Sequence, residues 1–195
     1  MPLRTKELVT TMNYHLFSLI NGWAGRSDGL DDVMEFLATT LIYVVFAGAF
    51  VLGAQALVRR RIRALVLVGA SLAVAFAVAM VLSRLNDQVR PFQTHHVHQL
   101  IAHEPGVSLP SDHATAAFTI AVAIAAFLHR GWSILLGAGA LAIGFARVWV
   151  GVHYPGDILA GLVIAVLAVG IVALGDRVVR RRRLAPSAPT APTAP

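Results

Sequence analysis

The sequence predicts an all-α fold, a polytopic membrane helical bundle with five or six transmembrane helices. Hydrophobic residues make up 57% of the 195-residue chain, and only 13% of the residues are charged. A soluble domain has about 25% charged residues, so this chain lacks the polar side chains that a fully wetted surface needs. Several apolar runs also approach the roughly 20 residues that an α-helix needs to cross a bilayer.

Five apolar runs have the length and composition of membrane spans. They cover residues 34–58, 64–82, 114–128, 132–150 and 158–175. The third is short, so we expect its helix to include flanking residues at its ends. A weaker run at 8–24 contains Asn13, His15 and Asn21. It is either a sixth span or an amphipathic helix lying at the membrane interface.

These runs divide the chain into three parts. We expect an amphipathic or weakly transmembrane segment at 1–33, a membrane domain at 34–176, and a basic cytoplasmic tail at 177–195. The tail is rich in proline and alanine, cannot bury a core, and is expected to be disordered.

Arginine placement predicts the orientation in the cell membrane. Basic residues cluster at 59–63, 129–130 and 177–183, and a cytoplasmic location for all three follows the positive-inside rule. The connections at 84–112 and 151–157 then lie on the extracytoplasmic side. The net charge of +6 is thereby explained by topology, so the bilayer and not nucleic acid is the expected partner. The chain has no cysteine, which excludes thiolate metal sites.

The two outer connections carry most of the reactive side chains. Arg90 and Arg147 can offer bidentate donors to phosphate oxygens. Ser111 and Asp112 are good N-cap residues for the run that begins at Ala114. The free N–H groups at a helix N-terminus bind anions, so this group of residues predicts a phosphate site.

A second pattern predicts covalent catalysis by histidine. His153 and Asp157 flank Pro155, which is typical of the first turn of a helix. A carboxylate four residues on can accept a hydrogen bond from one imidazole nitrogen, which leaves the other nitrogen free to attack phosphorus. His113, at another helix end, could protonate the leaving oxygen.

Three motifs in this order resemble the phosphatidic acid phosphatase type 2 superfamily, whose usual forms are K-x6-R-P, P-S-G-H and S-R-x5-H-x3-D. The matching segments are Arg90-Pro91, Pro110-Ser111-Asp112-His113 and Ala146-Arg147-x5-His153-x3-Asp157. The resemblance covers residues 30–175 and implies a helical-bundle phosphatase without metal or other cofactor. It assigns the nucleophile to His153, its orienting carboxylate to Asp157, the general acid to His113, and phosphate binding to Arg90, Ser111 and Arg147.

Three positions depart from those motifs. The lysine position falls on Ser83, with Arg84 one residue on, so we expect Arg84 to supply the basic group. Asp112 replaces the glycine of the second motif and is expected to lie beside the substrate. Ala146 replaces a serine and deletes one possible hydrogen bond to phosphate.

Within the superfamily, the chain is most similar to the bacitracin-resistance type of undecaprenyl-diphosphate phosphatase. This similarity rests on Asp112, on the Arg-Pro-Phe at 90–92, on the run at 151–157, and on the N-terminal residues Asn13, Tyr14, Phe17, Asn21, Leu30 and Asp31. It implies hydrolysis of a lipid diphosphate through a phosphohistidine. When a diphosphate is hydrolysed, the leaving group is a phosphate, whose second pKa is about 6 and which needs little protonation. Such a substrate tolerates the change from glycine to Asp112 beside the general acid His113.

Several alternatives stay open. The substrate could instead be phosphatidic acid or another glycerolipid phosphate, since the motifs bind only the phosphate. A small transporter is possible because polar clusters in membrane proteins line pathways, although these residues gather at one face. The histidines at 95, 96, 98 and 103 allow a metal-binding interpretation, but they lack regular ligand spacing, so a solvated loop is favoured. Glu35 is equally consistent with function and with an ordinary interfacial carboxylate.

Overall fold

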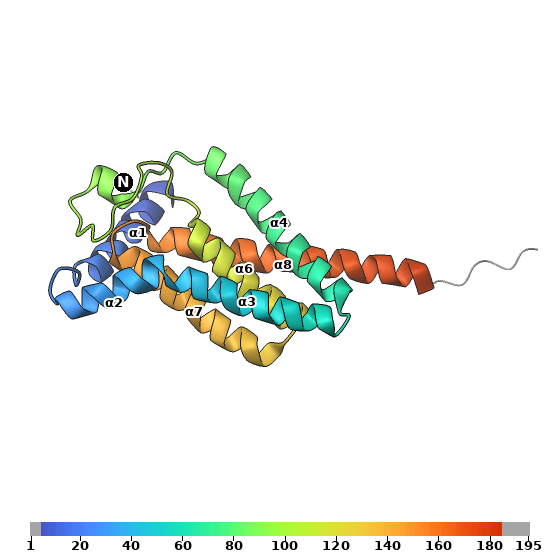
Figure 1. Ribbon diagram of the computed structural model, residues 1–195. Coiled ribbons are helices and arrows are strands. Elements are labelled where there is room, and N and C mark those ends of the chain that lie inside the picture. The colour runs from blue at the N-terminus through green and yellow to red at the C-terminus, as the bar shows by residue number, and fades with distance from the viewer. Residues whose placement is uncertain (1–4, 185–195) are drawn as a thin grey trace, which may run out of the picture.

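Helices form nearly all of the regular structure, as the apolar runs predict (Figure 1). The computed structural model describes residues 5–184. Across these residues the only extended pairing is an isolated bridge between Val89 and Val107. The helices are α1 (Thr5–Asn21), α2 (Asp28–Thr39), α3 (Leu41–Val58), α4 (Ile62–Arg84), α5 (Pro91–Thr94), α6 (Asp112–Phe127), α7 (Arg130–Trp149) and α8 (Pro155–Leu184).

The fold class is confirmed by the four described helices that are long and apolar enough to cross a membrane: α3, α4, α7 and α8. Helix α6 is a shorter apolar helix of 16 residues, ten of which are buried. It packs against α4, α7 and α8, so it forms the centre of the bundle. Burial on nearly all sides explains why its sequence is rich in alanine and carries no polar face.

The sequence prediction of one span at 34–58 is wrong in detail. The structure divides this run into α2 and α3, with the break at Thr40. The Thr39 hydroxyl donates to the Glu35 carbonyl at 2.7 Å, which is a back-bonding interaction that bends helices. The helix that is apolar enough to span a membrane therefore starts at Leu41, and α2 is a separate amphipathic helix at one end of the bundle.

The last helix is longer than predicted. Helix α8 continues to Leu184, through the arginines that the sequence assigns to a disordered tail beginning at residue 177. These long side chains have good helix propensity, and basic groups near a helix C-terminus interact favourably with its dipole. The rest of the predicted tail, 185–195, lies outside the described residues.

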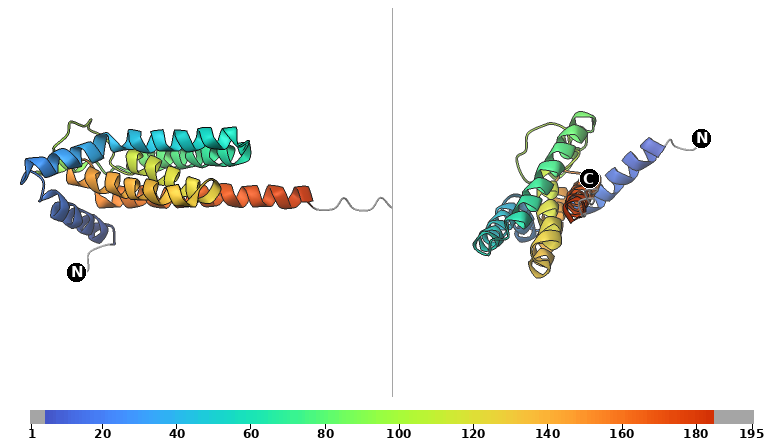
Figure 2. Two further views of the ribbon diagram at one scale, coloured as in Figure 1. Left: turned by 60° about the horizontal axis from the view of Figure 1, so that its bottom comes forward. Right: turned by 90° about the vertical axis from the view of Figure 1, so that its right-hand side faces the viewer.

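Side-chain hydrogen bonds fasten the N-terminal helices to the bundle. The buried Asn21 amide donates to the carbonyls of His98 (2.8 Å) and Trp149 (2.7 Å). Asp31 accepts from the Trp149 indole at 2.8 Å, and Asn13 accepts from the N–H of Gly156 at 2.8 Å. Helix α1 leans away from the bundle axis (Figure 2), and it exposes the apolar stripe Leu8, Met12, Leu16 and Leu19. Whether α1 crosses the membrane or lies at its interface stays a prediction.

The two ends of the bundle differ in chemistry. Helices α4 and α7 end, and α6 and α8 begin, at the end that the connection 85–111 covers (Figure 1). The opposite end contains the α3–α4 turn, the α6–α7 turn and the C-terminal part of α8, with their arginines. The candidate catalytic residues and the basic clusters therefore lie at opposite ends of the spans.

Candidate active site

The long connection between α4 and α6 folds back on itself. The Ser108 N–H donates to the Gln88 carbonyl at 2.8 Å, next to the bridge between Val89 and Val107. The Gln93 side chain closes the same loop by donating to the Gly106 carbonyl at 2.9 Å. This pairing brings Arg90 and Ser108, 18 positions apart in the chain, to the same site.

A tight turn after α7 positions the candidate nucleophile. Gly151 has a φ of +85°, and a Cβ there would lie 2.7 Å from the His98 carbonyl oxygen. Only glycine satisfies both demands without strain. The Arg147 carbonyl then accepts from the N–H groups of Val152 (3.2 Å) and His153 (3.3 Å), which fixes His153 beside the last turn of α7.

The His153 imidazole lies between a carboxylate and a guanidinium. Its Nδ1 is 3.3 Å from Asp157 Oδ2, and its Nε2 is 3.0 Å from Arg90 Nη1. A guanidinium only donates, so Nε2 is the acceptor and Nδ1 carries the proton that faces Asp157. The Tyr154 N–H donates to the same carboxylate oxygen at 2.8 Å and holds it in place. The tautomer therefore presents the Nε2 lone pair, as nucleophilic attack requires.

Electrostatics keep this imidazole neutral. His153 is 2% exposed, and burial lowers its pKa to about 4, although the hydrogen bond and charge of Asp157 oppose the shift. Arg147 and Arg90 lower the pKa of His153 further, since they repel a second positive charge. Burial also lowers the pKa of Arg90, and the charges of Asp157 and Asp112 oppose that shift. At neutral pH the site therefore holds a neutral histidine beside cationic arginines.

Ser108 is a site residue that the sequence motifs did not reveal. Its buried hydroxyl makes a short hydrogen bond to Asp157 Oδ2 and lies 3.5 Å from His153 Nδ1. Only its position two residues before Pro110 connects it with a motif. It completes a set of three donors around one carboxylate oxygen: the Ser108 hydroxyl, the Tyr154 N–H and His153 Nδ1.

Arg147 lies deeper than Arg90. It is 3% exposed, and its Nη1 donates to the Ala38 carbonyl at 3.4 Å. Among the described side chains, the buried Nε atoms of Arg147 and Arg90 have no hydrogen-bond partner in the protein. Buried donors in native proteins are normally satisfied, so these two have capacity for an anionic ligand.

The start of α6 contributes the second predicted motif. The buried Ser111 Oγ accepts from the Ala114 N–H at 3.5 Å, and the Ser111 N–H donates to the Asp157 carbonyl at 3.3 Å. Gly161 permits this approach of α6 to α8, because a Cβ there would lie 2.9 Å from the Thr115 nitrogen. Ser111 is therefore the N-cap residue of α6, as predicted.

His113 and Asp112 lie at the edge of this site. The His113 side chain is half-buried and close enough to Arg147, His103 and Arg90 for their charges to act on it. Asp112 is exposed on the first turn of α6, and its charge acts on Arg90.

The structure does not bring Arg84 to this cluster. Its side chain is exposed at the end of α4 and forms no hydrogen bond or ion pair with another residue in the range 5–184. The neighbouring Ser83 hydroxyl donates to the Met80 carbonyl of its own helix. Ala146 is fully buried in an apolar cluster with Ala38 of α2, so the side chain at that motif position packs in the core.

The loop histidines separate into different environments. His95 stacks on Tyr14, with ring centroids 4.0 Å apart, whereas the His98 backbone is held by Asn21. His103 lies over His153, with ring centroids 6.3 Å apart. Within residues 5–184, no group of three or more histidine or carboxylate side chains is arranged to hold a metal ion. Glu35 is half-buried on α2, where its backbone carbonyl accepts from the Thr39 hydroxyl.

Comparisons with known proteins identify the family. Residues 64–179 match the sequence model of the PAP2 superfamily. The undecaprenyl-diphosphatase BcrC of Bacillus subtilis (strain 168) is 35% identical over 161 residues, which cover 80% of each chain. The putative undecaprenyl-diphosphatase YbjG of Escherichia coli (strain K12) is 35% identical over 156 residues, 80% of this chain and 78% of its own.

Solved structures share the fold. Aquifex aeolicus LpxE superposes with a TM-score of 0.69 at 25% identity, over 84% of this chain and 95% of its own. A PAP2-type phosphatidylglycerolphosphate phosphatase from Bacillus subtilis superposes with a TM-score of 0.65 at 22% identity, over 89% of both chains. The second likeness concerns the fold alone.

Proposed function

Because this chain belongs to the PAP2 superfamily and is a multi-pass membrane lipid phosphatase, we propose that it hydrolyses a polyprenyl diphosphate, such as undecaprenyl diphosphate, to the monophosphate and free phosphate. The reaction runs through a phosphohistidine on His153. The observation that carries this proposal is the environment of His153, whose Nδ1 faces Asp157 and whose Nε2 accepts from Arg90.

In the first step the Nε2 lone pair of His153 attacks the terminal phosphorus. A nitrogen–phosphorus bond forms as the bond from phosphorus to the bridging oxygen breaks, and the lipid monophosphate leaves with that electron pair. The positive charge that develops on the imidazole is stabilised by Asp157 through Nδ1. Ser108 and the Tyr154 N–H hold the carboxylate in the orientation that this requires.

The arginines stabilise the group in transfer. Arg90 and Arg147 each have a buried Nε without a protein partner, and both can donate to equatorial phosphate oxygens. Ser111 lies at the N-terminus of α6, where the positive end of the helix dipole faces the phosphate. The negative charge of Asp112 favours the cationic form of Arg90. Arg90 must shift its contact from Nε2 to the phosphate as the substrate enters.

His113 acts as the general acid and then as the general base. It protonates the departing oxygen where protonation is needed, and it afterwards takes a proton from the water that attacks the phosphohistidine. That second attack breaks the nitrogen–phosphorus bond, releases phosphate and returns the lone pair to Nε2. Burial and the positive charges of Arg147, His103 and Arg90 disfavour the imidazolium form of His113. A neutral imidazole suits the base step, and the weakly basic phosphate that leaves in the first step asks little of His113 as an acid.

The choice of a lipid diphosphate rests on the relatives. Two proteins that are 35% identical over about four fifths of this chain are named as an undecaprenyl-diphosphatase and a putative one. A phosphate leaving group is far less basic than an alkoxide, and it therefore needs little from a partly exposed acid such as His113.

The side of the membrane follows from charge. Arginines cluster at one end of the spans and the catalytic residues lie at the other. The positive-inside rule therefore supports a cell-membrane enzyme whose site faces the extracytoplasmic side.

Phosphate release from defined lipids in detergent tests the substrate. We expect kcat/KM on undecaprenyl diphosphate to exceed that on phosphatidic acid and on lipid A phosphate by roughly tenfold or more. The His153→Ala protein controls for contaminating phosphatases. A higher kcat/KM on phosphatidic acid would leave the family membership standing and remove the substrate assignment.

Cysteine labelling tests the orientation, because the chain has no native cysteine. A cysteine at the exposed Gln99 should react in intact cells with a membrane-impermeant reagent, whereas one at the exposed Arg182 should not. The reverse pattern would invert the proposed topology.

A further inference from the structure

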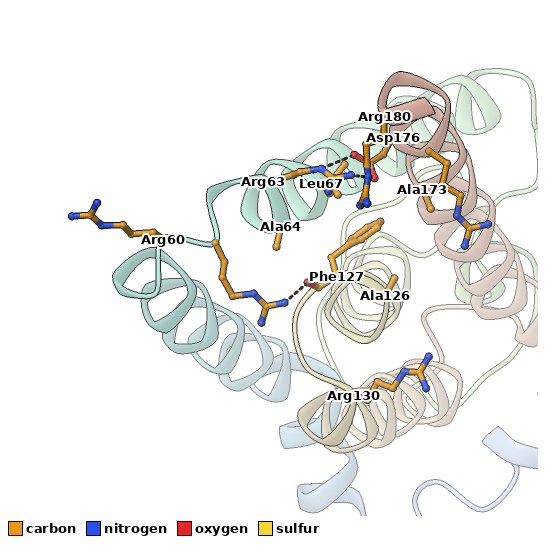
Figure 3. A pocket seen from close by; sticks show the side chains of 12 residues that line it. Arg60, Arg63, Ala64, Leu67, Ala126, Phe127, Arg130, Ala173, Asp176 and Arg180 are labelled. Carbon is orange, nitrogen blue, oxygen red and sulfur yellow. Dashed lines mark hydrogen bonds and ion pairs between the residues drawn. The ribbon is translucent and has the colours of Figure 1, made fainter. Parts of the chain in front are cut away.

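A second polar cavity lies at the basic end of the bundle, opposite the candidate active site. It has a volume of about 630 Å³ and opens between the start of α4, the α6–α7 turn and the C-terminal half of α8 (Figure 3). Six arginines and a single carboxylate, Asp176, line it. No step of the proposed reaction uses any of these residues.

Two of the arginines build the walls of this cavity. Arg63 forms a bidentate ion pair with Asp176, with Nε 2.8 Å from Oδ1, and this pair joins α4 to α8. Arg61 donates to the carbonyls of Phe127 (3.1 Å) and Leu128 (3.0 Å), which lie at the end of α6. These contacts engage both guanidinium groups in the protein and hold the cavity in shape.

Three further arginines are left for a ligand. The guanidinium groups of Arg130, Arg177 and Arg180 form no hydrogen bond or ion pair with any residue in the range 5–184. Figure 3 shows Arg130 on one side of the cavity and the Arg63–Asp176 pair on the other, whereas Arg60 points away. Cationic groups that line one cavity repel each other, so an anion between them would be bound favourably.

The inner part of the cavity is apolar. Leu67 and Ala173 lie about one helical turn further from the basic end than Arg63 and Asp176, and Phe127 lines the same space. The cavity therefore combines a cationic rim with an apolar inner wall, at one end of the helices that are apolar enough to span a membrane. A free anion would use only the rim, whereas a phospholipid would use both parts.

We propose that this cavity binds the phosphate group of an anionic membrane phospholipid, with Arg130, Arg177 and Arg180 as its donors and the wall of Leu67, Phe127 and Ala173 against the glycerol and first acyl carbons. Guanidinium groups bind phosphate oxygens through paired donors, so three of them around one cavity suit one phosphodiester. The bound lipid would bridge α7 and α8 at the end where they are not joined by side-chain bonds among the described residues.

Native mass spectrometry of the detergent-purified full-length protein tests this site. The protein is titrated with phosphatidylglycerol and, separately, with phosphatidylcholine of the same acyl chains. We expect one phosphatidylglycerol to bind at least roughly tenfold more tightly than phosphatidylcholine. The Arg130→Gln/Arg177→Gln/Arg180→Gln protein should lose that preference, while its phosphate-release activity in detergent shows that it is folded.

A matched control separates the cavity from general charge. Arg181, Arg182 and Arg183 are exposed in the last turn of α8 and do not line the cavity. The Arg181→Gln/Arg182→Gln/Arg183→Gln protein has the same net charge as the cavity variant and should keep the preference. The Arg90→Gln protein should keep it too, which excludes binding at the candidate active site.

Three results would overturn the proposal. They are equal binding of the two lipids to the unmodified protein, an equal loss in the control triple variant, and full competition by millimolar inorganic phosphate, which would assign the cavity to a soluble anion. The readout is lipid retention and not turnover. Failure here would therefore leave the proposed hydrolase function untouched, and failure of that function would leave this site standing.

Discussion

Replacing Ser108 with alanine removes a single donor from the carboxylate that orients the nucleophile. The Ser108 hydroxyl is fully buried, and its hydrogen bond goes to Asp157 Oδ2, which is also the partner of His153 Nδ1. A hydrogen bond to a charged group contributes about 1.5–3 kcal/mol. Since about 1.4 kcal/mol corresponds to a tenfold change in rate, the ceiling for this variant is a loss of about 10- to 150-fold.

The expected loss in kcat lies near the lower end of that range, at about tenfold, because two of the three donors to Asp157 Oδ2 remain. The KM should change by less than about twofold, since Ser108 orients Asp157 and is not proposed to touch the substrate. Steady-state phosphate release in detergent measures both constants.

The matched control is Ser71→Ala. Ser71 is also fully buried, but its hydroxyl donates to the Leu67 carbonyl within α4, away from the site. This variant should keep wild-type kcat. Wild-type kcat in Ser108→Ala would refute the orienting role of Ser108, and so would a rise in KM at constant kcat, because that would mean contact with substrate.

The remaining predictions concern the nucleophile, its charge and metals. His153→Ala should abolish turnover while the thermal unfolding profile stays nearly unchanged, and Asp157→Asn should lower kcat severely but less completely because the attacking atom remains; near-normal turnover in His153→Ala would exclude the assignment. In ¹⁵N-histidine NMR, the His153 resonance is the one that His153→Ala removes. It should titrate near pH 4, because burial disfavours the imidazolium, and the nucleophile should therefore stay neutral from pH 7 down to about pH 5. Titration near 6.5 would contradict the buried site. Phosphate release should survive excess chelator, since arginines and helix-end amides can neutralise the transferred group; full loss that one divalent ion restores would instead make His103 a candidate ligand.

Local sequence patterns predicted the parts of the site that lie on one short segment. His153 and Asp157 are four residues apart across a helix start, and the turn at Gly151 places His153 beside Arg147. Their relative geometry therefore depends mostly on local backbone structure. The helical bundle was predictable for a similar reason, because a bilayer requires apolar helices of a set length.

Other features depend on contacts between distant segments, and spacing does not reveal these. Ser108 reaches Asp157 only because the connection 85–111 folds back through the bridge between Val89 and Val107. Arg84 shows the reverse case, since it lies next to the motif's lysine position and yet is exposed at the end of α4. The break at Thr40 was missed because threonine is tolerated in helices, and only the Thr39 hydrogen bond reveals the bend.

The sequence predicts only a topological role for the arginine clusters. The structure adds that Arg61 and Arg63 make specific contacts, to α6 and to Asp176. These contacts shape a cavity whose lining comes from three separate segments. A one-dimensional charge pattern contains no information about that convergence.

The most direct measurement of the central claim is to trap the phosphoenzyme. The protein is mixed with a polyprenyl diphosphate that carries ³²P in its terminal phosphate, quenched in alkali within the first turnover, and digested. We predict a label that is stable in base and labile in acid, carried by the peptide that contains His153 and absent from the His153→Ala protein. A burst of phosphate release without any labelled peptide, or a label on another residue, would contradict the phosphohistidine mechanism.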